Sequence, residues 1–79
     1  PLELNLIGMH VEEGIEALDR YLDQAIVHHV KQVRIIHGMG TGRLRAAVWD
    51  DLDKNPVVKS KMAAGPNEGG LGATIVLLK

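Results

Sequence analysis

The segment of residues 37–42, His-Gly-Met-Gly-Thr-Gly, has the composition of an anion-binding loop. Glycines let a backbone approach an anion closely and adopt positive φ angles, and a loop that leads into a helix presents free N–H groups to phosphate. Two arginines follow in the first turns of that helix, where cations oppose the helix dipole unless an external anion is bound. We therefore predict a phosphate-binding set made up of Gly38, Gly40, Thr41, Gly42, Arg43 and Arg45. The alternative is a tight strand-to-helix turn in which Thr41 caps the helix.

His37 is the titratable side chain at the start of this loop. Because an unperturbed histidine titrates near pH 6.5, it can exchange protons at neutral pH. We predict that His37 is the general acid or base of the site; the alternative is a loop histidine that hydrogen-bonds the backbone. His10 precedes the first predicted helix, and we expect it at the same sheet edge as His37. No residues have the spacing of a metal site, and the glycines match neither a Walker loop nor a dinucleotide fingerprint.

Hydropathy periodicity predicts the elements that must position this loop. The segments, in chain order, are a strand over 2–6, a helix over 11–29, a strand over 33–36, a helix from 43 to 54, a strand over 57–63 and a strand over 73–78. Strands joined through helices pair in parallel, and the last two strands form an antiparallel hairpin. We therefore predict an α/β fold, an α+β sandwich of βαβαββ order. It should have a four-stranded mixed sheet with both helices on one face.

The composition limits both architecture and environment. The 79 residues form a single domain, 1–79, and because the chain begins with Pro we expect it to be a fragment of a longer protein. The absence of Cys excludes disulfides and thiolate metal sites, which favours a reducing, cytoplasmic location. No apolar run approaches the length of a membrane span, so we expect no membrane association.

The charge is divided along the chain. Residues 1–30 contain six acids and one base, whereas residues 31–79 contain eight bases and four acids. This division suggests a basic surface that faces an anionic partner; the alternative is an acidic, solvated face on the first helix. Asp50, Asp51 and Asp53 of the second helix are expected on a solvated face.

Three blocks of sequence resemble the Smr (small MutS-related) domain, most closely the C-terminal domain of bacterial MutS2 proteins. They are residues 4–13, residues 37–42 and residues 69–76, and they occur in the family's order over essentially the whole chain. The resemblance implies a fold similar to the C-terminal domain of translation initiation factor three. It also assigns His37, Gly38, Gly40, Thr41 and Gly42 to the family's active-site loop, whereas Arg43 and Arg45 come from position and charge alone.

The resemblance implies a nucleic-acid-binding domain that nicks branched DNA as an endonuclease, with roles in DNA repair and in suppressing homologous recombination. The alternative is a non-catalytic module that binds DNA, RNA or the ribosome; a small-molecule phosphate enzyme is a third possibility. Binding should be independent of base sequence, and Mg²⁺ or Mn²⁺ is a candidate cofactor for activity. We expect the isolated domain to be a monomer and the parent protein a homodimer.

This chain departs from the family pattern in the first block. The resemblance implies Asp at position 5 and Arg or His at position 7, where this chain has Asn5 and Ile7. Asn5 cannot accept a proton as a carboxylate does, and Ile7 cannot bind phosphate through a charge. If those two groups are needed for cleavage, the domain only binds nucleic acid.

Overall fold

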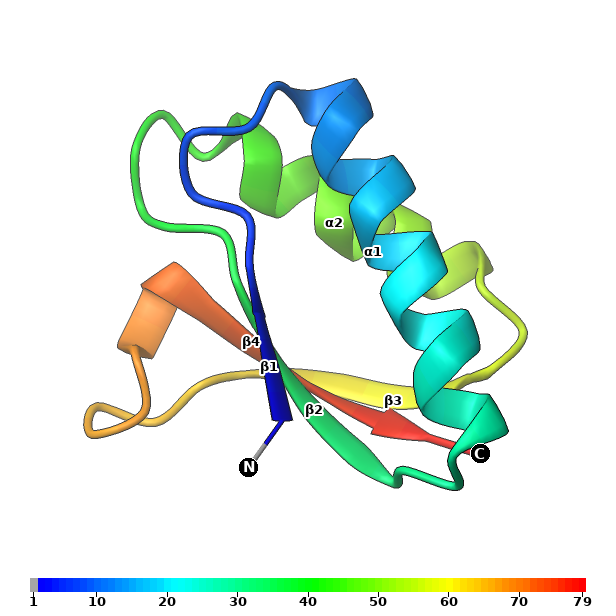
Figure 1. Ribbon diagram of the computed structural model, residues 1–79. Coiled ribbons are helices and arrows are strands. Elements are labelled where there is room, and N and C mark those ends of the chain that lie inside the picture. The colour runs from blue at the N-terminus through cyan, green and yellow to red at the C-terminus, as the bar shows by residue number, and fades with distance from the viewer. Residues whose placement is uncertain (1) are drawn as a thin grey trace.

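The computed structural model describes residues 2–79 and shows a four-stranded sheet with both helices on one face (Figure 1). The elements are β1 (Leu2–Asn5), α1 (Val11–Val27), β2 (Gln32–Ile36), α2 (Arg43–Lys54), β3 (Val58–Ala63), the short 3₁₀ helix η1 (Gly70–Gly72) and β4 (Ala73–Leu78). The predicted order and fold class are confirmed. α1 is two residues shorter than predicted, because His29 adopts a left-handed φ of 60° that ends the helical turn.

The sheet has the strand order β1-β2-β4-β3 and is mixed. β1 runs parallel to β2, with Leu4 opposite Ile35, whereas β4 is antiparallel to both of its neighbours. The last strand of the chain therefore lies inside the sheet, and it is buried along most of its length. The N-terminal strand and the β3 strand form the two edges.

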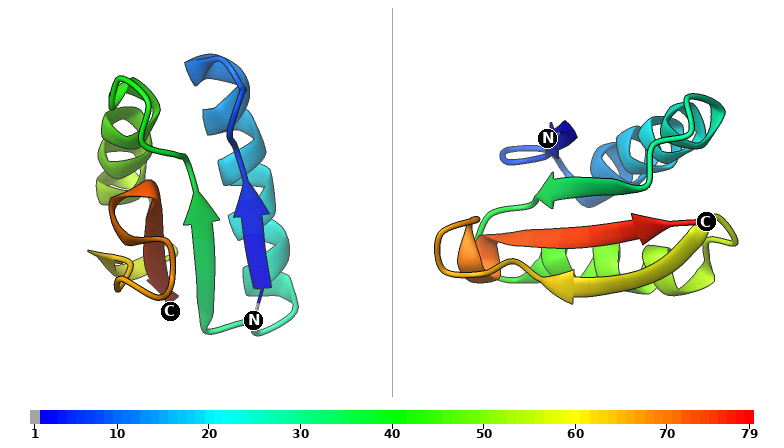
Figure 2. Two further views of the ribbon diagram at one scale, coloured as in Figure 1. Left: turned by 90° about the vertical axis from the view of Figure 1, so that its left-hand side faces the viewer. Right: turned by 90° about the horizontal axis from the view of Figure 1, so that it is seen from below.

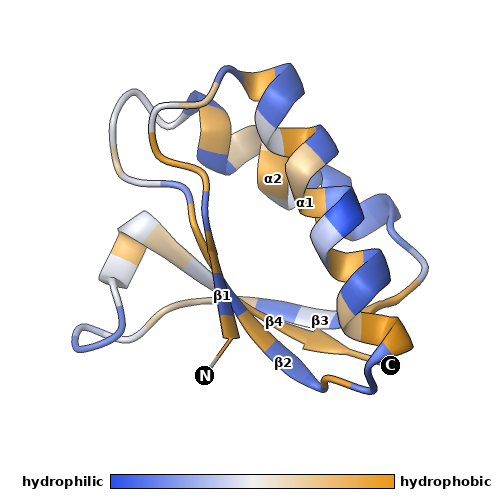
Figure 3. Cartoon of the chain, in the orientation of Figure 1, coloured by the Kyte–Doolittle hydropathy of each residue, from blue (hydrophilic) through white to orange (hydrophobic). Residues whose placement is uncertain are grey.

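The main core fills the space between the helices and the sheet. Its fully buried side chains come from every layer: Leu6, Leu18, Leu22, Val33, Ile35, Val48, Leu52 and Val76. Apolar residues of both helices face the sheet, and hydrophilic residues face outward (Figure 3). Burial of these side chains is the principal term that stabilises a domain of this size.

Gly14 lets the two helices approach closely near their first turns. It is buried, and a methyl group added there would lie 2.8 Å from Leu44 Cδ1 of α2. This contact explains a glycine inside a helix, which costs about 1 kcal/mol of helix propensity relative to Ala. The close approach brings the start of α1 beside the start of α2, so the connections that precede them lie side by side (Figures 1 and 2).

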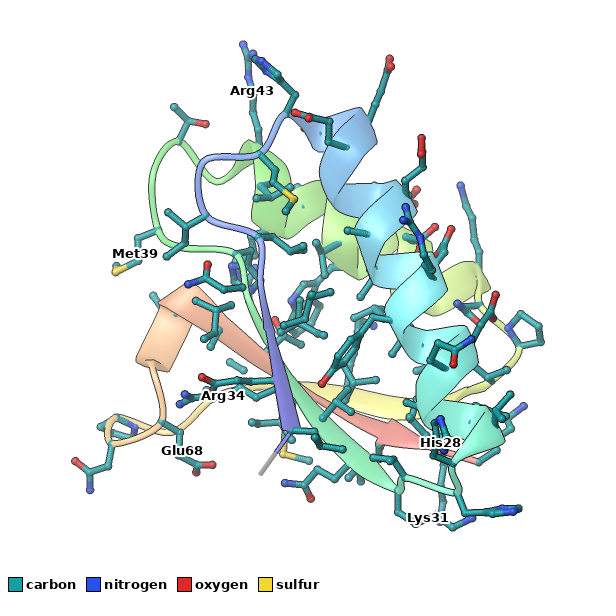
Figure 4. The ribbon with its side chains drawn as sticks, viewed as in Figure 1. His28, Lys31, Arg34, Met39, Arg43 and Glu68 are labelled. Carbon is teal, nitrogen blue, oxygen red and sulfur yellow. The ribbon has the colours of Figure 1, made fainter. Side chains whose placement is uncertain are left out.

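The opposite face of the sheet carries a small second cluster of Ala64, Ala73 and Ile75. Arg34 crosses this face: it pairs with Glu3 of β1, and its Nη1 donates to the Glu68 carbonyl at 2.8 Å. Arg34 thus ties the turn before η1 to the sheet (Figure 4). Neither helix within residues 2–79 is long and apolar enough to cross a membrane.

Candidate nucleic-acid interface

A groove of about 560 Å³ lies between the β1–α1 and β2–α2 connections. It is lined by residues 7–11 and 37–45, so the whole predicted phosphate-binding set and His10 line one site. Both connections leave the carboxyl ends of parallel strands, which is the usual position of ligand sites in such sheets. No carboxylate lines this groove among the described residues. We call it the glycine groove.

The backbone of the loop requires its glycines. Gly38, Gly40 and Gly42 have φ values of 78°, 25° and 85°, a region that other residues rarely adopt. Gly42 is the N-cap of α2 and supplies no side-chain cap, while Thr41 Oγ1 accepts only a long hydrogen bond of 3.4 Å from Arg43 N. First-turn N–H groups of α2 therefore remain available to an anion, which favours the anion-binding interpretation over the simple capped turn.

His37 is buried beneath the loop, with 5 % of its surface exposed. Its Nδ1 lies 3.0 Å from the Gly38 carbonyl, which can only accept, so Nδ1 carries the proton. Its Nε2 lies 2.7 Å from Thr74 Oγ1, and that oxygen accepts a hydrogen bond of 2.8 Å from Trp49 Nε1. The Thr74 hydroxyl thus donates to His37 Nε2. Both ring nitrogens of His37 therefore form hydrogen bonds, and every polar group from Trp49 Nε1 to the Gly38 carbonyl has a hydrogen-bond partner.

The surroundings favour the neutral form of His37. Burial lowers the pKa of His37 below its usual value of 6.5, and the nearby Arg45 charge lowers it further, while the bond to the Gly38 carbonyl opposes both. A neutral ring is what the Thr74 hydrogen bond needs. In this conformation His37 positions the loop, and its predicted role as general acid or base stays a prediction.

Residues 69–76, the last of the three sequence blocks, hold the start of the glycine loop through backbone hydrogen bonds. The Gly72 carbonyl accepts hydrogen bonds from His37 N at 3.1 Å and Gly38 N at 2.9 Å. A methyl group on Gly72 would lie 3.4 Å from Met39 Cγ, so a larger residue would press against the loop. This contact links residues 69–76 to the glycine groove, a relation that the sequence alone does not show.

Arg43 and Arg45 differ from three cations of the domain that are paired with carboxylates. Arg34, Lys54 and Lys61 pair with Glu3, Asp50 and Asp53, respectively. Arg43 and Arg45 have no carboxylate partner within residues 2–79, and both line the glycine groove. Figure 4 shows Arg43 extending from the start of α2 at the top of the domain.

Trp49 holds Arg45 in place. The Arg45 guanidinium lies over the indole ring, 4.4 Å from its centroid, and Lys61 Nζ lies 4.8 Å from the same centroid. Stacking on an aromatic ring restricts an arginine while leaving its outer donors free. Trp49 therefore serves the glycine groove twice, through Arg45 and through Thr74, and nothing in its sequence context had singled it out.

The two unusual residues of the first block have distinct places. Asn5 Oδ1 accepts a hydrogen bond from Ile7 N at 2.9 Å, which shapes the turn after β1. Ile7 is 60 % exposed, and its Cγ1 would lie 3.2 Å from a methyl group on Gly38. Position 7 therefore lies directly against the glycine loop, where a charged side chain could reach a bound anion.

A second groove, missed by the sequence analysis, lies between the helices. It is lined by Asp19, Asp23, Asp51, Lys54, Asn55, Pro56 and Val57, and we call it the acidic groove. Asp51 was expected on a solvated face, but one of its oxygens and one of Asp19 are buried without another partner. Burial, a hydrogen bond to Asp19 and the Asp19 charge raise the pKa of Asp51 to about 7, so Asp51 keeps its proton to a higher pH than an exposed aspartate does. Across residues 2–79, no three or more His, Cys, Asp or Glu side chains are grouped to hold a metal ion.

The model of the Smr domain family matches residues 4–79 of this chain. The chain belongs to the Smr domain family. Its relatives include proteins named Endonuclease MutS2 from Thermomicrobium roseum, 52 % identical over 77 residues, and from Exiguobacterium sibiricum, 48 % identical over 77 residues. In each case the match covers 98 % of this chain and 10 % of the relative, so the chain spans about a tenth of the length of these proteins.

Solved structures agree with the family and the fold. The Smr domain of Thermus thermophilus MutS2 is 37 % identical and superimposes with a TM-score of 0.98, covering 100 % of this chain and 99 % of that one. YdaL, a stand-alone small MutS-related protein from Escherichia coli, is 31 % identical with a TM-score of 0.91, covering 98 % and 63 %. The resemblance inferred from the three sequence blocks is confirmed.

Proposed function

We propose that this Smr domain binds the sugar-phosphate backbone of a nucleic acid in the glycine groove. The observation that carries this proposal is the pair Arg43 and Arg45, which line the groove without a carboxylate partner in the described chain. Unpaired guanidinium groups beside backbone N–H donors suit a phosphate. Contacts of this kind fix a nucleic acid without reading its bases, so binding is independent of sequence.

The test is the salt dependence of DNA binding, measured by fluorescence anisotropy with a short duplex. For the Arg43→Ala/Arg45→Ala variant we expect about tenfold weaker binding, and a log–log salt slope that is shallower by about 2 because two phosphate contacts are lost. Lys54→Ala is the matched control: it also removes a cation from α2, but one that pairs with Asp50. Equal losses in both variants would contradict a specific role for the glycine groove.

Nicking of the bound strand is the finer proposal, and the name of the relatives, Endonuclease MutS2, favours it. In such hydrolysis a water oxygen adds to phosphorus, one P–O bond breaks and the leaving oxygen takes up a proton. Loop N–H groups and Arg43 would stabilise the charge that develops on phosphorus-bound oxygens. For His37 to exchange that proton, its Nε2 must first release Thr74.

A plasmid-nicking assay separates cleavage from binding. Conversion of supercoiled plasmid to open circle is followed with and without Mg²⁺ or Mn²⁺ for the unchanged chain and for His37→Gln, which can hydrogen-bond but cannot relay a proton. Loss of nicking with unchanged DNA affinity would support His37 as the proton carrier. Absence of nicking by the unchanged chain, alongside salt-sensitive binding, would favour the binding module and point to Asn5 and Ile7 as the cause.

The physiological target belongs to the same proposal. Branched DNA, with roles in DNA repair and in suppressing recombination, follows from the family resemblance; ribosomal RNA is the alternative. Binding competition between a four-way DNA junction, a linear duplex and a ribosomal RNA fragment ranks these targets directly. We also propose that the isolated domain is a cytoplasmic monomer and that its parent protein is a homodimer.

A further inference from the structure

Eight large apolar side chains are exposed among the described residues, and half of them lie at the glycine groove. Four of them, Ile7, Met9, Val11 and Met39, line the groove, and Ile7 and Met39 are 60 % and 66 % exposed. Exposed apolar groups gathered at a ligand site are more informative than the same number scattered over a surface. We call these four residues the apolar rim.

The apolar rim is held next to the proposed phosphate position. Ile7 lies against Gly38 from the first connection, and Met39 belongs to the glycine loop itself. Figure 4 shows Met39 projecting outward from the loop and Arg43 projecting at the other side of the same connection. Exposed apolar side chains and a guanidinium without a carboxylate partner therefore line the same groove.

We infer that the apolar rim receives an unstacked nucleobase of the strand bound in the glycine groove, an inference that rests on the proposed function. In a fully paired duplex the base faces are covered by stacking, and the rim then meets only hydrated backbone. A mismatched or unpaired base exposes its face at little cost, and burying that face against Ile7 and Met39 is favourable. The occupant is a nucleic acid because the lining of the groove combines arginines with apolar groups and includes no carboxylate among the described residues.

The test compares three DNA probes of equal length and charge, each measured by anisotropy at one salt concentration. The first is fully paired, the second has a central run of mismatched bases, and the third replaces both strands of that run by abasic sites. We expect the mismatched probe to bind about fivefold more tightly than the paired and the abasic probes, which corresponds to burying one base face. Arg43→Ala should weaken binding to all three.

The variant Ile7→Ser/Met39→Ser should remove the preference, so that it binds the mismatched, paired and abasic probes equally. Both side chains are exposed, so the fold does not depend on them. Val27→Ser is the matched control, because Val27 is 64 % exposed at the far end of α1 and should leave the preference intact.

Three results would overturn the inference. Equal affinity for the mismatched and abasic probes would show that strand flexibility, and not the base, is recognised. Persistence of the preference in the double variant would assign it to other residues. Concentration-dependent dimerisation that Ile7→Ser/Met39→Ser abolishes would identify the rim as a contact between two copies of this chain. Failure to bind any probe would reject the proposed function itself, whereas equal binding of all three leaves that function standing.

Discussion

This domain has two grooves of opposite charge, one between the connections that precede the helices and one between the helices themselves. The glycine groove is lined by Arg43 and Arg45 without a carboxylate among the described residues, whereas the acidic groove is lined by three aspartates and Lys54. In the acidic groove the raised pKa of Asp51 reduces the negative charge near neutral pH. In the glycine groove the described chain offers the arginines no counter-charge.

The difference shows that a small domain must compensate charges between packed elements, whereas it can leave an exposed charge uncompensated. The Asp19–Asp51 pair lies between packed helices, where leaving both carboxylates ionised is costly. Arg43 lies exposed at a helix start, where an unbalanced cation costs only tenths of a kcal/mol. The acidic groove thus affects stability and its pH dependence, whereas the glycine groove has cations that the described chain leaves without a carboxylate partner.

The largest effect on the free energy of unfolding is expected at Thr74, which hydrogen-bonds to His37 beneath the glycine loop. Thr74→Val removes the hydroxyl that joins Trp49 to His37, while keeping nearly the same volume. Two polar groups lose their partner, and we expect the free energy of unfolding in urea to fall by about 3 kcal/mol. Thr74→Ser keeps the hydroxyl and should cost about 1 kcal/mol, the value for one buried methyl group. A Val variant as stable as the Ser variant would show that the hydrogen-bond chain contributes nothing.

An effect of intermediate size on the free energy of unfolding is expected in the acidic groove, and it depends on pH. Because the folded pKa of Asp51 is about 7 against 3.8 in an exposed carboxyl, the folded state holds a proton that the unfolded chain releases. Its contribution is therefore fully present below pH 3.8 and is lost as the pH rises through about 7. Asp51→Asn, which can donate to Asp19 without a charge, should raise stability by about 1 kcal/mol at pH 8, a value reduced for partial solvent exposure.

The control for this prediction is the same measurement at pH 4, where Asp51→Asn should change little. Glu16→Gln removes an exposed carboxylate of α1 and should leave both values unchanged. His37 acts in the reverse direction, because its lowered pKa makes stability fall as the pH drops below 6.5. The difference in unfolding free energy between the Asp51 variant and the unchanged chain removes the contribution of His37, because His37 is present in both. An equal gain in stability at both pH values would refute the raised pKa of Asp51.

The smallest effect is expected from sharpening the charge of the glycine groove. Ile7→Arg places a guanidinium beside Gly38, the position at which the resemblance implies Arg or His. We expect about threefold tighter binding to paired DNA and a salt slope steeper by about 1, as for one added phosphate contact. Arg20, an exposed cation on α1, provides the comparison: Arg20→Ala should leave both quantities unchanged. Unaltered binding by Ile7→Arg would place the phosphate away from position 7.

Local patterns were sufficient to predict most of the fold and the position of the glycine loop. Alternating and helical spacing of apolar residues indicated each strand and helix, and the glycines of residues 37–42 indicated positive φ angles. Contacts between distant residues were not predictable in the same way. His37 meets Thr74, Asp19 meets Asp51, and Gly14 meets Leu44 only after the sheet and helices have assembled. These pairings depend on packing and leave no periodic signal in the sequence.

The bonds from His37 N and Gly38 N to the Gly72 carbonyl have a consequence for the order of folding. They join residues separated by more than thirty positions, and β4, which follows Gly72, occupies the interior of the sheet. On a ribosome, the first half of the chain emerges long before this support exists. A nascent or truncated chain that lacks residues 69–79 therefore lacks both of the hydrogen bonds that hold the start of the glycine loop.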